Sequence, residues 1–259
     1  MNRAVPRHEL LTFREPRPDR PCVVIPVLNE GERFAAQLTR MEPLLADLDL
    51  YVVDGGSTDG CTDPERLAAA GAAARLRLLD GPGLSSQLRA GFAHALATRH
   101  PGVVTLDGNG KDGVDAIPSF VQALDEGWDF VQGSRYVPGG HAENTPLDRT
   151  LAVRLLHAPL LSLAAGTRYT DTTNGFRAFS ARFLEDPRVL PFREVFQTYS
   201  LHYYLSVRAA RLGFRVKELP VTRVYPARGP VPSKIGGLLG KARIVGQLLA
   251  AAGGRYDPR

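Results

Sequence analysis

Buried-strand patterns in this chain repeatedly end in polar turns, and this repetition constrains the fold more than any other feature. The runs CVVIPVLNE (22–30), DLYVVDGGSTDGC (49–61) and GVVTLDGNGKDG (102–113) are apolar and then break into glycine, asparagine and acidic residues. A further short strand pattern covers 74–83, and helical patterns separate the strands. This alternation predicts an α/β fold with a Rossmann-like, doubly wound and mostly parallel sheet and helices on both faces.

The polar strand ends predict a ligand site. Asn29 and Glu30 follow the first of these strands, Asp54 follows the second, and Asp107 follows the strand that begins near residue 102. In doubly wound sheets, ligands bind outside the carboxyl ends of the strands, where the winding reverses. The alternative is that Gly, Asn and Asp simply make turns. That explanation accounts for each end singly but does not predict an acid after successive strands.

The remaining segments predict how the chain is divided. Residues 1–20 are rich in proline and arginine, which predicts an extended arm. Residues 21–234 are predicted to form one domain, and they contain no internal repeat. Within it, an apolar helix is expected around 149–166 and a strand over 214–226. Residues 235–259 predict a C-terminal amphipathic helix and tail, either resting on a membrane interface or packed on the body.

Composition excludes several classes of protein. The formal charge is +5, but no Lys/Arg block marks a nucleic-acid-binding tail, so we expect no nucleic-acid partner. Two cysteines, Cys22 and Cys61, cannot form a disulfide framework or a zinc site by themselves. The first residues lack the apolar core of a secretory signal, and the apolar run 155–166 is shorter than the roughly 20 residues of a spanning helix. We therefore expect a cytoplasmic protein, with peripheral contact at the inner membrane face left open.

Eight segments together resemble one enzyme family. In order along about residues 21–234 they are VVIPVLNE, VVDGGSTDG, TLDGNGKD, GSRYVPGG, PLDR, DTTNGFRAFS, LGFRVKELPVTR and SK. The chain resembles the family 2 glycosyltransferases of GT-A fold, and in pattern the dolichyl-phosphate and polyprenyl-phosphate mannosyltransferases. GSRYVPGG and DTTNGFRAF are the most specific of these segments. The resemblance implies an inverting transfer of a sugar from a nucleotide-diphosphate sugar, GDP-mannose or a UDP-sugar, to a phosphate-bearing acceptor such as a polyprenyl phosphate.

The resemblance also implies a set of donor-binding residues. The first two strand ends would meet the nucleoside, with Asp54 accepting hydrogen bonds from base or ribose. Relatives often carry two consecutive acids there, whereas this chain has Asp54-Gly55. The segment PARGPVPSKI (226–235) resembles a loop that closes over the diphosphate. The expected donor-binding residues are Pro26, Asn29, Glu30, Asp54, Ser57, Asp107, Gly108, Arg228 and Lys234.

Asp107 and Asn109 are the candidate metal ligands. A divalent ion such as Mg²⁺ or Mn²⁺ prefers oxygen ligands and neutralises a leaving diphosphate. Asn109 stands where the usual Asp-x-Asp pattern has a second charge, and Lys111 stands where relatives place a metal-binding glutamine. We therefore expect weak metal dependence, with Lys111 contacting the diphosphate directly. The alternative is a surface ion pair between Lys111 and Asp112.

Arg135 and Arg149 match family positions that hold the acceptor's phosphate, which planar guanidinium groups grip bidentately. Asp171 matches a position near the reacting centre, where it would act as a base or orient the acceptor, or else only cap a turn. With Lys111 and Asp112, Asp171 completes the candidate catalytic residues. Two alternatives remain: a soluble transferase that acts on a small-molecule or glycan hydroxyl, and a silent homologue that only binds nucleotide sugar.

Overall fold

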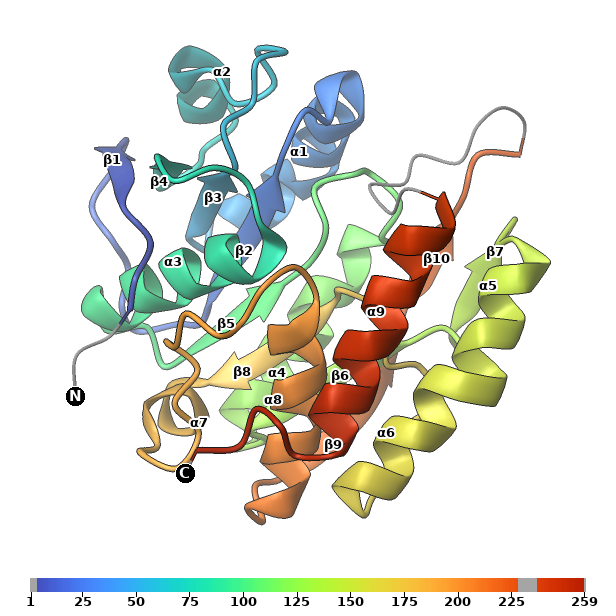
Figure 1. The fold of residues 1–259 in the computed structure, drawn as a ribbon. Helices are drawn as coiled ribbons and strands as arrows, with labels where there is room; N and C mark the ends of the chain where they lie inside the picture. The colour runs from blue at the N-terminus through green and yellow to red at the C-terminus, as the bar shows by residue number, and fades with distance from the viewer. Residues whose placement is uncertain (1–3, 228–236, 259) are drawn as a thin grey trace.

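The structure of the protein is a computed structural model that describes residues 4–227 and 237–258. Its centre is an eight-stranded sheet in the described part of the chain, with the order β1-β4-β3-β2-β5-β8-β6-β9 (Figure 1). β10 pairs with β7 in a separate two-stranded sheet. The strands are β1 His8–Thr12, β2 Cys22–Val27, β3 Leu50–Asp54, β4 Ala74–Leu78, β5 Gly102–Thr105, β6 Phe130–Ser134, β7 His141–Glu143, β8 Arg177–Ser180, β9 Val216–Pro220 and β10 Thr222–Val224.

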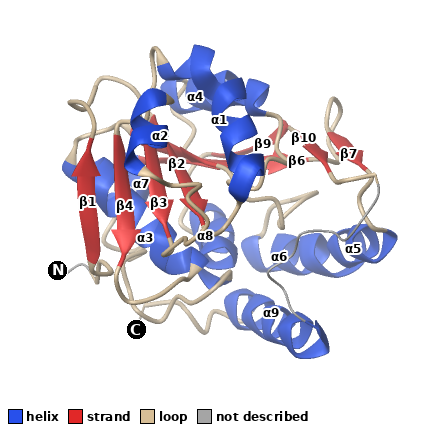
Figure 2. Cartoon of the chain, turned by 90° about the horizontal axis from the view of Figure 1, so that it is seen from above, coloured by secondary structure: helices blue, strands red, loops and turns tan. Residues whose placement is uncertain are grey.

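Helices cover both faces of the sheet. Figure 2 shows α1, α2 and α4 on one side and α3, α8, α6 and α9 on the other. The side chains of each central strand alternate between the two layers: Val23 and Ile25 pack with α1, whereas Val24 packs with α3. The helices are α1 Gly31–Leu45, α2 Pro64–Ala69, α3 Leu84–Ala97, α4 Ile117–Asp125, α5 Leu147–Ala152, α6 Ala158–Ala165, α7 Ala181–Glu185, α8 Ser200–Arg211 and α9 Gly237–Ala252.

The order of strands places a topological switch between β2 and β5. β2, β3 and β4 run in parallel toward one side, and the chain then returns through α3 to place β5 on the other side of β2, again in parallel. The carboxyl ends of β2 and β5 therefore lie next to each other at the place where such sheets bind ligands. The predicted α/β, doubly wound and mostly parallel fold is confirmed.

Three parts of the sheet differ from the sequence prediction. Within the predicted arm, residues 8–12 form β1, which pairs antiparallel with the edge strand β4. β8 was not expected, and it lies antiparallel between β5 and β6. The strand predicted over 214–226 is two strands, because the chain leaves the main sheet after Pro220 and β10 pairs with β7 instead. Proline lacks the N–H that would continue a ladder, which suits it to this break.

The predicted helix near residues 149–166 consists of three parts. α5 leads through a π-helical segment, Val153–His157, into α6. The C-terminal helix α9 packs on α6 and α8, where its Leu248 and Ala251 are buried beside Leu161 (Figure 1). In the described residues no helix is long and apolar enough to cross a membrane.

Candidate active site

The first two strand ends form one cross-linked rim. The Asn29 backbone N–H donates to Ser57 Oγ at 3.0 Å, and the Thr58 N–H donates to Asn29 Oδ1 at 2.8 Å. Asn29 has a φ of 49°, a left-handed conformation that asparagine tolerates well. Behind this rim, the Gln87 amide nitrogen of α3 donates to the backbone oxygens of Val27 and Val53. The ends of β2 and β3 are thus held at a fixed separation.

Asp54 is buried inside this rim. Its Oδ1 accepts hydrogen bonds from the backbone N–H groups of Gly56 and Ser57, and its Oδ2 accepts one from Thr62 Oγ1 at 3.1 Å. Gly55 is packed against α3, since a Cβ at that position would lie 3.2 Å from the Gln87 amide nitrogen. The Asp54 carboxylate therefore shapes the loop from within. Direct contact with a base or ribose, as the resemblance implied, would require this fully buried carboxylate to become exposed.

Two other predicted donor-binding residues, Pro26 and Gly108, meet where β2 and β5 diverge. A Cβ on Gly108 would lie 2.9 Å from Val27 Cγ2 and 3.2 Å from the Pro26 carbonyl oxygen, so only glycine fits without displacing β2. Glu30 is nearly buried and forms an ion pair with Arg33 at 3.1 Å. Arg228 and Lys234, the two predicted diphosphate contacts from the closing loop, lie outside the described residues.

Asp107 lies at the carboxyl end of β5 and is paired with an arginine that the sequence analysis did not single out. Arg223 of β10 donates from Nη2 to Asp107 Oδ2 at 2.8 Å and from Nη1 to Asp112 Oδ1 at 2.6 Å. The Asp107 side chain keeps 27% of its surface exposed, whereas that of Asp112 has none. Burial alone would raise the pKa of Asp107, but the charge of Arg223 keeps this pKa below its ordinary value. Asp107 thus offers one open side to a ligand.

The expected alternative of a surface pair between Lys111 and Asp112 is wrong. Both residues are buried, and the hydrogen-bonded ion pair of Asp112 is with Arg223. Burial, followed by the charge of Arg223, lowers the pKa of Lys111. The Lys111 ammonium instead lies 5.0 Å from the ring centroid of Tyr225.

Tyr225 is the centre of a cluster of cations. The guanidinium carbons of Arg149 and Arg223 lie 5.5 and 5.8 Å from the ring centroid, and Arg149 Nη1 donates to the Tyr225 hydroxyl at 3.4 Å. Burial alone raises the pKa of a tyrosine, but Arg223, Arg135 and the Arg149 bond bring that of Tyr225 below its ordinary value. The surroundings therefore favour negative charge, as a phosphate-binding site requires.

Asp171 and Arg135 form a buried bidentate ion pair. Arg135 Nε and Nη2 donate to the two Asp171 oxygens at 2.6 and 3.0 Å, and Nη2 also donates to Thr173 Oγ1 at 2.9 Å. Glu218 of β9 accepts the Asp171 backbone N–H. Arg135 was predicted to hold acceptor phosphate and Asp171 to act at the reacting centre. In this structure each is the other's partner, so the pair fixes the loop that follows β6.

A second buried arginine holds the segment that begins with Asp171. Arg177 donates to the backbone oxygens of Thr172 and Asn174 at 2.8 and 3.0 Å, and to that of His202 on α8 at 2.7 Å. Burial lowers the pKa of Arg177 to about 10. Because β8 is antiparallel to β5, the segment before it reaches the same edge as Asp107. The resemblance to the family singled out this segment. The role of Arg177 in holding it could not be predicted, because that role depends on tertiary contacts.

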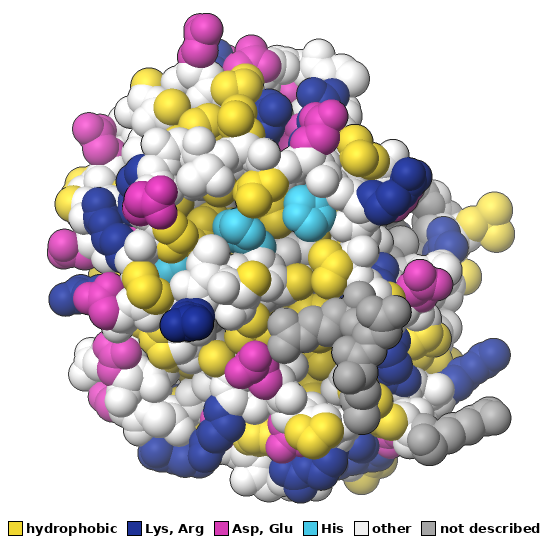
Figure 3. Space-filling model, turned by 90° about the vertical axis from the view of Figure 1, so that its left-hand side faces the viewer, with side chains coloured by type: hydrophobic (Ala, Val, Ile, Leu, Met, Phe, Trp, Pro, Cys, Tyr) yellow, Lys and Arg dark blue, Asp and Glu magenta, His cyan; other side chains and the backbone are white. Residues whose placement is uncertain are grey.

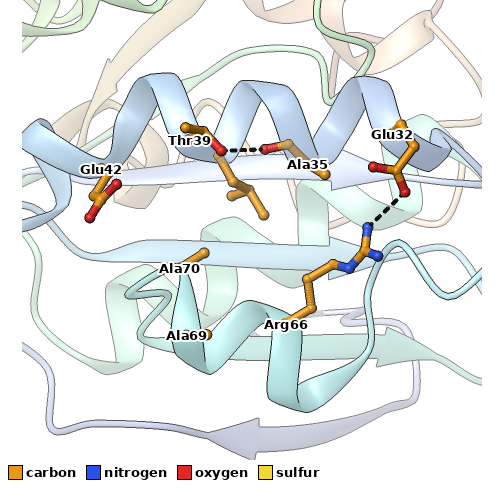
Figure 4. Close-up of a pocket in the computed structure, with 8 residues that line it drawn as sticks. Glu32, Ala35, Thr39, Glu42, Arg66, Ala69 and Ala70 are labelled. Atoms are coloured by element: carbon orange, nitrogen blue, oxygen red, sulfur yellow. Dashed lines mark hydrogen bonds and ion pairs between the residues drawn. The ribbon is translucent and has the colours of Figure 1, made fainter.

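A hollow elsewhere on the molecule is separate from this edge. It measures about 320 Å³ and lies between α1 and α2, lined mainly by Ala35, Thr39, Ala69 and Ala70, with the Glu32–Arg66 ion pair at one end (Figure 4). None of the predicted site residues lines it. The chemistry-bearing side chains are gathered at the ends of β2, β3, β5 and β6 instead.

Comparison with known proteins identifies the family. Residues 22–187 match the family described as Glycosyl transferase family 2. An undecaprenyl-phosphate mannosyltransferase from Micrococcus luteus is 31% identical over 227 residues, covering 86% of this chain and 90% of the relative. This chain belongs to glycosyl transferase family 2. It is a glycosyltransferase.

Other relatives extend the likeness. A polyprenol monophosphomannose synthase from Mycolicibacterium smegmatis is 30% identical over 212 residues, covering 78% of this chain and 77% of that protein. Among solved structures, glucosyl-3-phosphoglycerate synthase from Mycobacterium tuberculosis, in complex with Mn²⁺, UDP and glucosyl-3-phosphoglycerate, has a TM-score of 0.62. It is 22% identical, with 93% of this chain and 81% of that chain covered, so it shows the shared fold of these glycosyltransferases.

Proposed function

We propose that this family 2 glycosyltransferase moves a sugar, with inversion, from a nucleotide-diphosphate sugar to the phosphate of a polyprenyl-phosphate acceptor. The observation that carries the proposal is the group of cations Lys111, Arg149 and Arg223 around Tyr225, directly beside Asp107. Such a group can receive two phosphate-bearing ligands side by side. The names of the two relatives described above, both polyprenyl-phosphate enzymes, support the acceptor.

The donor would lie along the rim from Asn29 to Asp107. The nucleoside is assigned to the loops of Asn29 and Ser57, which Asp54 and Gln87 hold in place. The diphosphate is assigned to the open side of Asp107 and to Lys111. GDP-mannose and UDP-sugars are the candidate donors for this assignment.

The donor set at Asp107 is compatible with Mg²⁺ or Mn²⁺. Asp107 and Asn109 each present a side-chain oxygen, and such ions are commonly bound by one or two protein ligands with substrate phosphates and water completing the shell. A solved structure of the same fold contains Mn²⁺ and UDP, which supports a divalent cofactor. When bound, the ion would neutralise negative charge on the diphosphate. We expect weak dependence on it, because Lys111 and Arg223 already supply positive charge.

The acceptor would approach from the side of Arg149. A phosphate oxygen attacks the anomeric carbon opposite the leaving diphosphate, so the configuration inverts. Because a phosphate is already an anion, it needs no general base, and Asp171 is assigned the role of orienting Arg135. Lys111 stabilises charge on the leaving group. Most of the rate enhancement would then come from positioning and charge neutralisation.

Exposed leucines beside Arg149 support contact with a membrane. Leu147, Leu151 and Leu155 follow one another at four-residue spacing through α5 and the π-helical segment, and they are 72%, 47% and 73% exposed. Leu239 of α9 is also exposed, and Lys241 of α9 pairs with Asp148 of α5 at 3.2 Å. We call these four leucines the leucine surface.

Charge around the leucine surface is consistent with this contact. Arg154, Lys241 and Arg243 are exposed on the same helices, and cations flanking apolar side chains suit an anionic lipid surface. On the opposite side, Figure 3 shows basic and acidic side chains interspersed with apolar ones. Arg149 belongs to the same helix, α5, and its side chain is turned toward Tyr225.

A transfer assay tests the proposal. Radiolabelled GDP-mannose and UDP-sugars are offered with undecaprenyl phosphate in detergent, with a panel of small-molecule and glycan hydroxyl acceptors in parallel. We expect label to enter the organic phase with at least one donor, and Asp107→Asn to reduce this transfer at least tenfold. Transfer exclusively to hydroxyl acceptors, or release of free sugar alone, would refute the polyprenyl-phosphate acceptor.

A further inference from the structure

The ligands proposed for a divalent ion are already engaged with groups of the protein. Arg223 occupies Asp107 Oδ2 at 2.8 Å. The Asn109 amide donates from Nδ2 to the same oxygen at 3.3 Å, while its Oδ1 accepts the Lys111 backbone N–H at 3.3 Å. An ion that is to bind Asp107 Oδ2 or Asn109 Oδ1 must therefore compete with these groups, and one that binds Asp107 Oδ1 alone would lie on the same carboxylate as the Arg223 charge. The strongest competitor is the guanidinium, because its bond to the carboxylate is charge-assisted.

Arg223 is fixed in this place by a second acid. Its Nη1 donates to Asp112 Oδ1 at 2.6 Å, and the backbones of Asp112 and Arg223 form a β-bridge. The other oxygen of Asp112, Oδ2, is buried and has no hydrogen-bond partner among the described atoms. Arg223 is therefore the strongest partner of Asp112, and the guanidinium spans two carboxylates that would otherwise repel each other.

The charges of these groups balance without an ion. Asp107 and Asp112 contribute two negative charges, and Arg223 and Lys111 contribute two positive charges. An arginine remains charged at all ordinary pH values, so Arg223 always acts as a cation at Asp107. A divalent ion would add two further positive charges beside Arg223. The diphosphate of a donor would reverse that imbalance, because it brings negative charge to the same place.

We propose that Arg223 is the resident cation of the Asp107 site: it competes with a divalent ion for Asp107, so that the ion binds well only together with a diphosphate. The inference rests on the proposed function for the identity of the diphosphate. It adds a residue that sets the metal affinity of the site and the order in which metal and donor bind. Arg223 is a positioning residue here, acting on the metal through Asp107.

Mn²⁺ titration tests the inference without an activity measurement. Free Mn²⁺ is followed by electron paramagnetic resonance as it is added to the wild type, Arg223→Gln and the double variant Arg223→Gln/Asp112→Asn. The double variant has the same net charge as the wild type and leaves neither partner of the buried pair alone. The control is Arg66→Gln, which removes a distant surface cation paired with Glu32. Thermal unfolding checks that each variant is folded.

We expect Mn²⁺ to bind about tenfold more tightly to both Arg223 variants than to the wild type, with Arg66→Gln within about twofold. Addition of GDP or UDP should tighten Mn²⁺ binding to the wild type more than to the variants. If Arg223→Gln does not fold, the Mn²⁺ affinity of the double variant alone is compared with that of the wild type. Equal or weaker Mn²⁺ binding in the folded Arg223 variants, or no binding in any protein, overturns the inference.

The transfer assay on the same preparations separates this inference from the proposed function. Sugar transfer by the wild type with unchanged Mn²⁺ affinity in the Arg223 variants would refute the inference and leave the function standing. Tighter Mn²⁺ binding in the variants without any sugar transfer by the wild type would refute the function and support the resident cation.

Discussion

Gly175 lies directly against the carboxylate of Asp107. A Cβ built on Gly175 would stand 2.5 Å from Asp107 Oδ1, closer than real Cβ atoms approach an oxygen. The contact joins two segments that are 68 residues apart, the turn before β8 and the end of β5. Together with Arg223 on the other oxygen, it determines where the Asp107 carboxylate lies.

Gly175→Ala should therefore impair the site while the fold is retained. The added methyl must displace the Asp107 carboxylate or the turn, and catalytic groups displaced by about 1 Å commonly lose two orders of magnitude in rate. We expect kcat/KM to fall at least tenfold. Gly246→Ala in α9 is the control, since a Cβ there has no atom within 4 Å. Wild-type activity in folded Gly175→Ala would contradict this role.

Arg149→Lys should affect the acceptor more than the donor. Lysine keeps the charge but loses the planar fork and the bond to the Tyr225 hydroxyl. We expect the acceptor KM to rise about tenfold, with the donor KM within about twofold. Initial rates at varied concentrations of each substrate measure both values, and Arg66→Lys is the control. Equal rises in the two KM values would remove Arg149 from acceptor binding.

Chelation of metal should slow the enzyme without stopping it. Lys111 and Arg223 supply positive charge beside Asp107, so we expect roughly a tenth or more of the activity to persist in EDTA. Lys111→Met should make the remaining activity far more dependent on added Mg²⁺ or Mn²⁺. Activity titrated against EDTA and each ion provides the measurement. An absolute and tight metal requirement in the wild type would exclude Lys111 from this role.

Charge on the leucine surface should weaken membrane binding. Leu151→Glu/Leu155→Glu places two carboxylates on exposed side chains, so we expect folding to be unchanged. In flotation with vesicles that contain anionic lipid, the bound fraction should fall at least fivefold. Leu79→Glu/Leu10→Glu, on the exposed positions near β1, is the matched control. Equal flotation of the two double variants would argue against the leucine surface.

Acid should destabilise the fold through Asp49. This buried carboxylate accepts the Arg17 backbone N–H at 2.7 Å and pairs with Arg14 and His100. Burial alone raises its pKa, but these partners lower it from 3.8 to about 2. Because the folded pKa is the lower one, the contribution to stability is complete above the unfolded value and disappears as pH falls from about 4 to 2.

The free energy of unfolding measures this contribution. Urea titrations at pH 7 and pH 3 should show that Asp49→Asn costs on the order of 1–2 kcal/mol at pH 7 and less at pH 3. The exposed Asp47→Asn is the control. A cost that does not change between the two pH values would show that hydrogen-bond geometry, rather than charge, explains the effect.

The sequence predicted the parallel half of the sheet and the rim residues, because these depend on local patterns. Asp107 at the end of β5 follows directly from an apolar run and a polar turn. Arg223 was not found, since its segment was read as a continuation of the strand that ends at Pro220. The pairing of β10 with β7, which brings Arg223 to Asp112, joins residues far apart in the chain.

The contacts between side chains could not be predicted, for the same reason. Arg135 was expected to hold acceptor phosphate and Asp171 to act as a base, orient the acceptor or cap a turn, and their contact with each other was not anticipated. Likewise, Lys111 and Asp112 are neighbours in sequence, yet Asp112 pairs with Arg223. Local spacing identifies which residues are present at an edge, but tertiary contacts decide their partners.

A crystal structure with a bound nucleotide-diphosphate sugar tests the account most directly. We predict the diphosphate on the open side of Asp107, within hydrogen-bond distance of the Lys111 ammonium, and the nucleoside against the loops of Asn29 and Ser57. A donor bound away from the ends of β2 and β5, at saturating concentration, would contradict it.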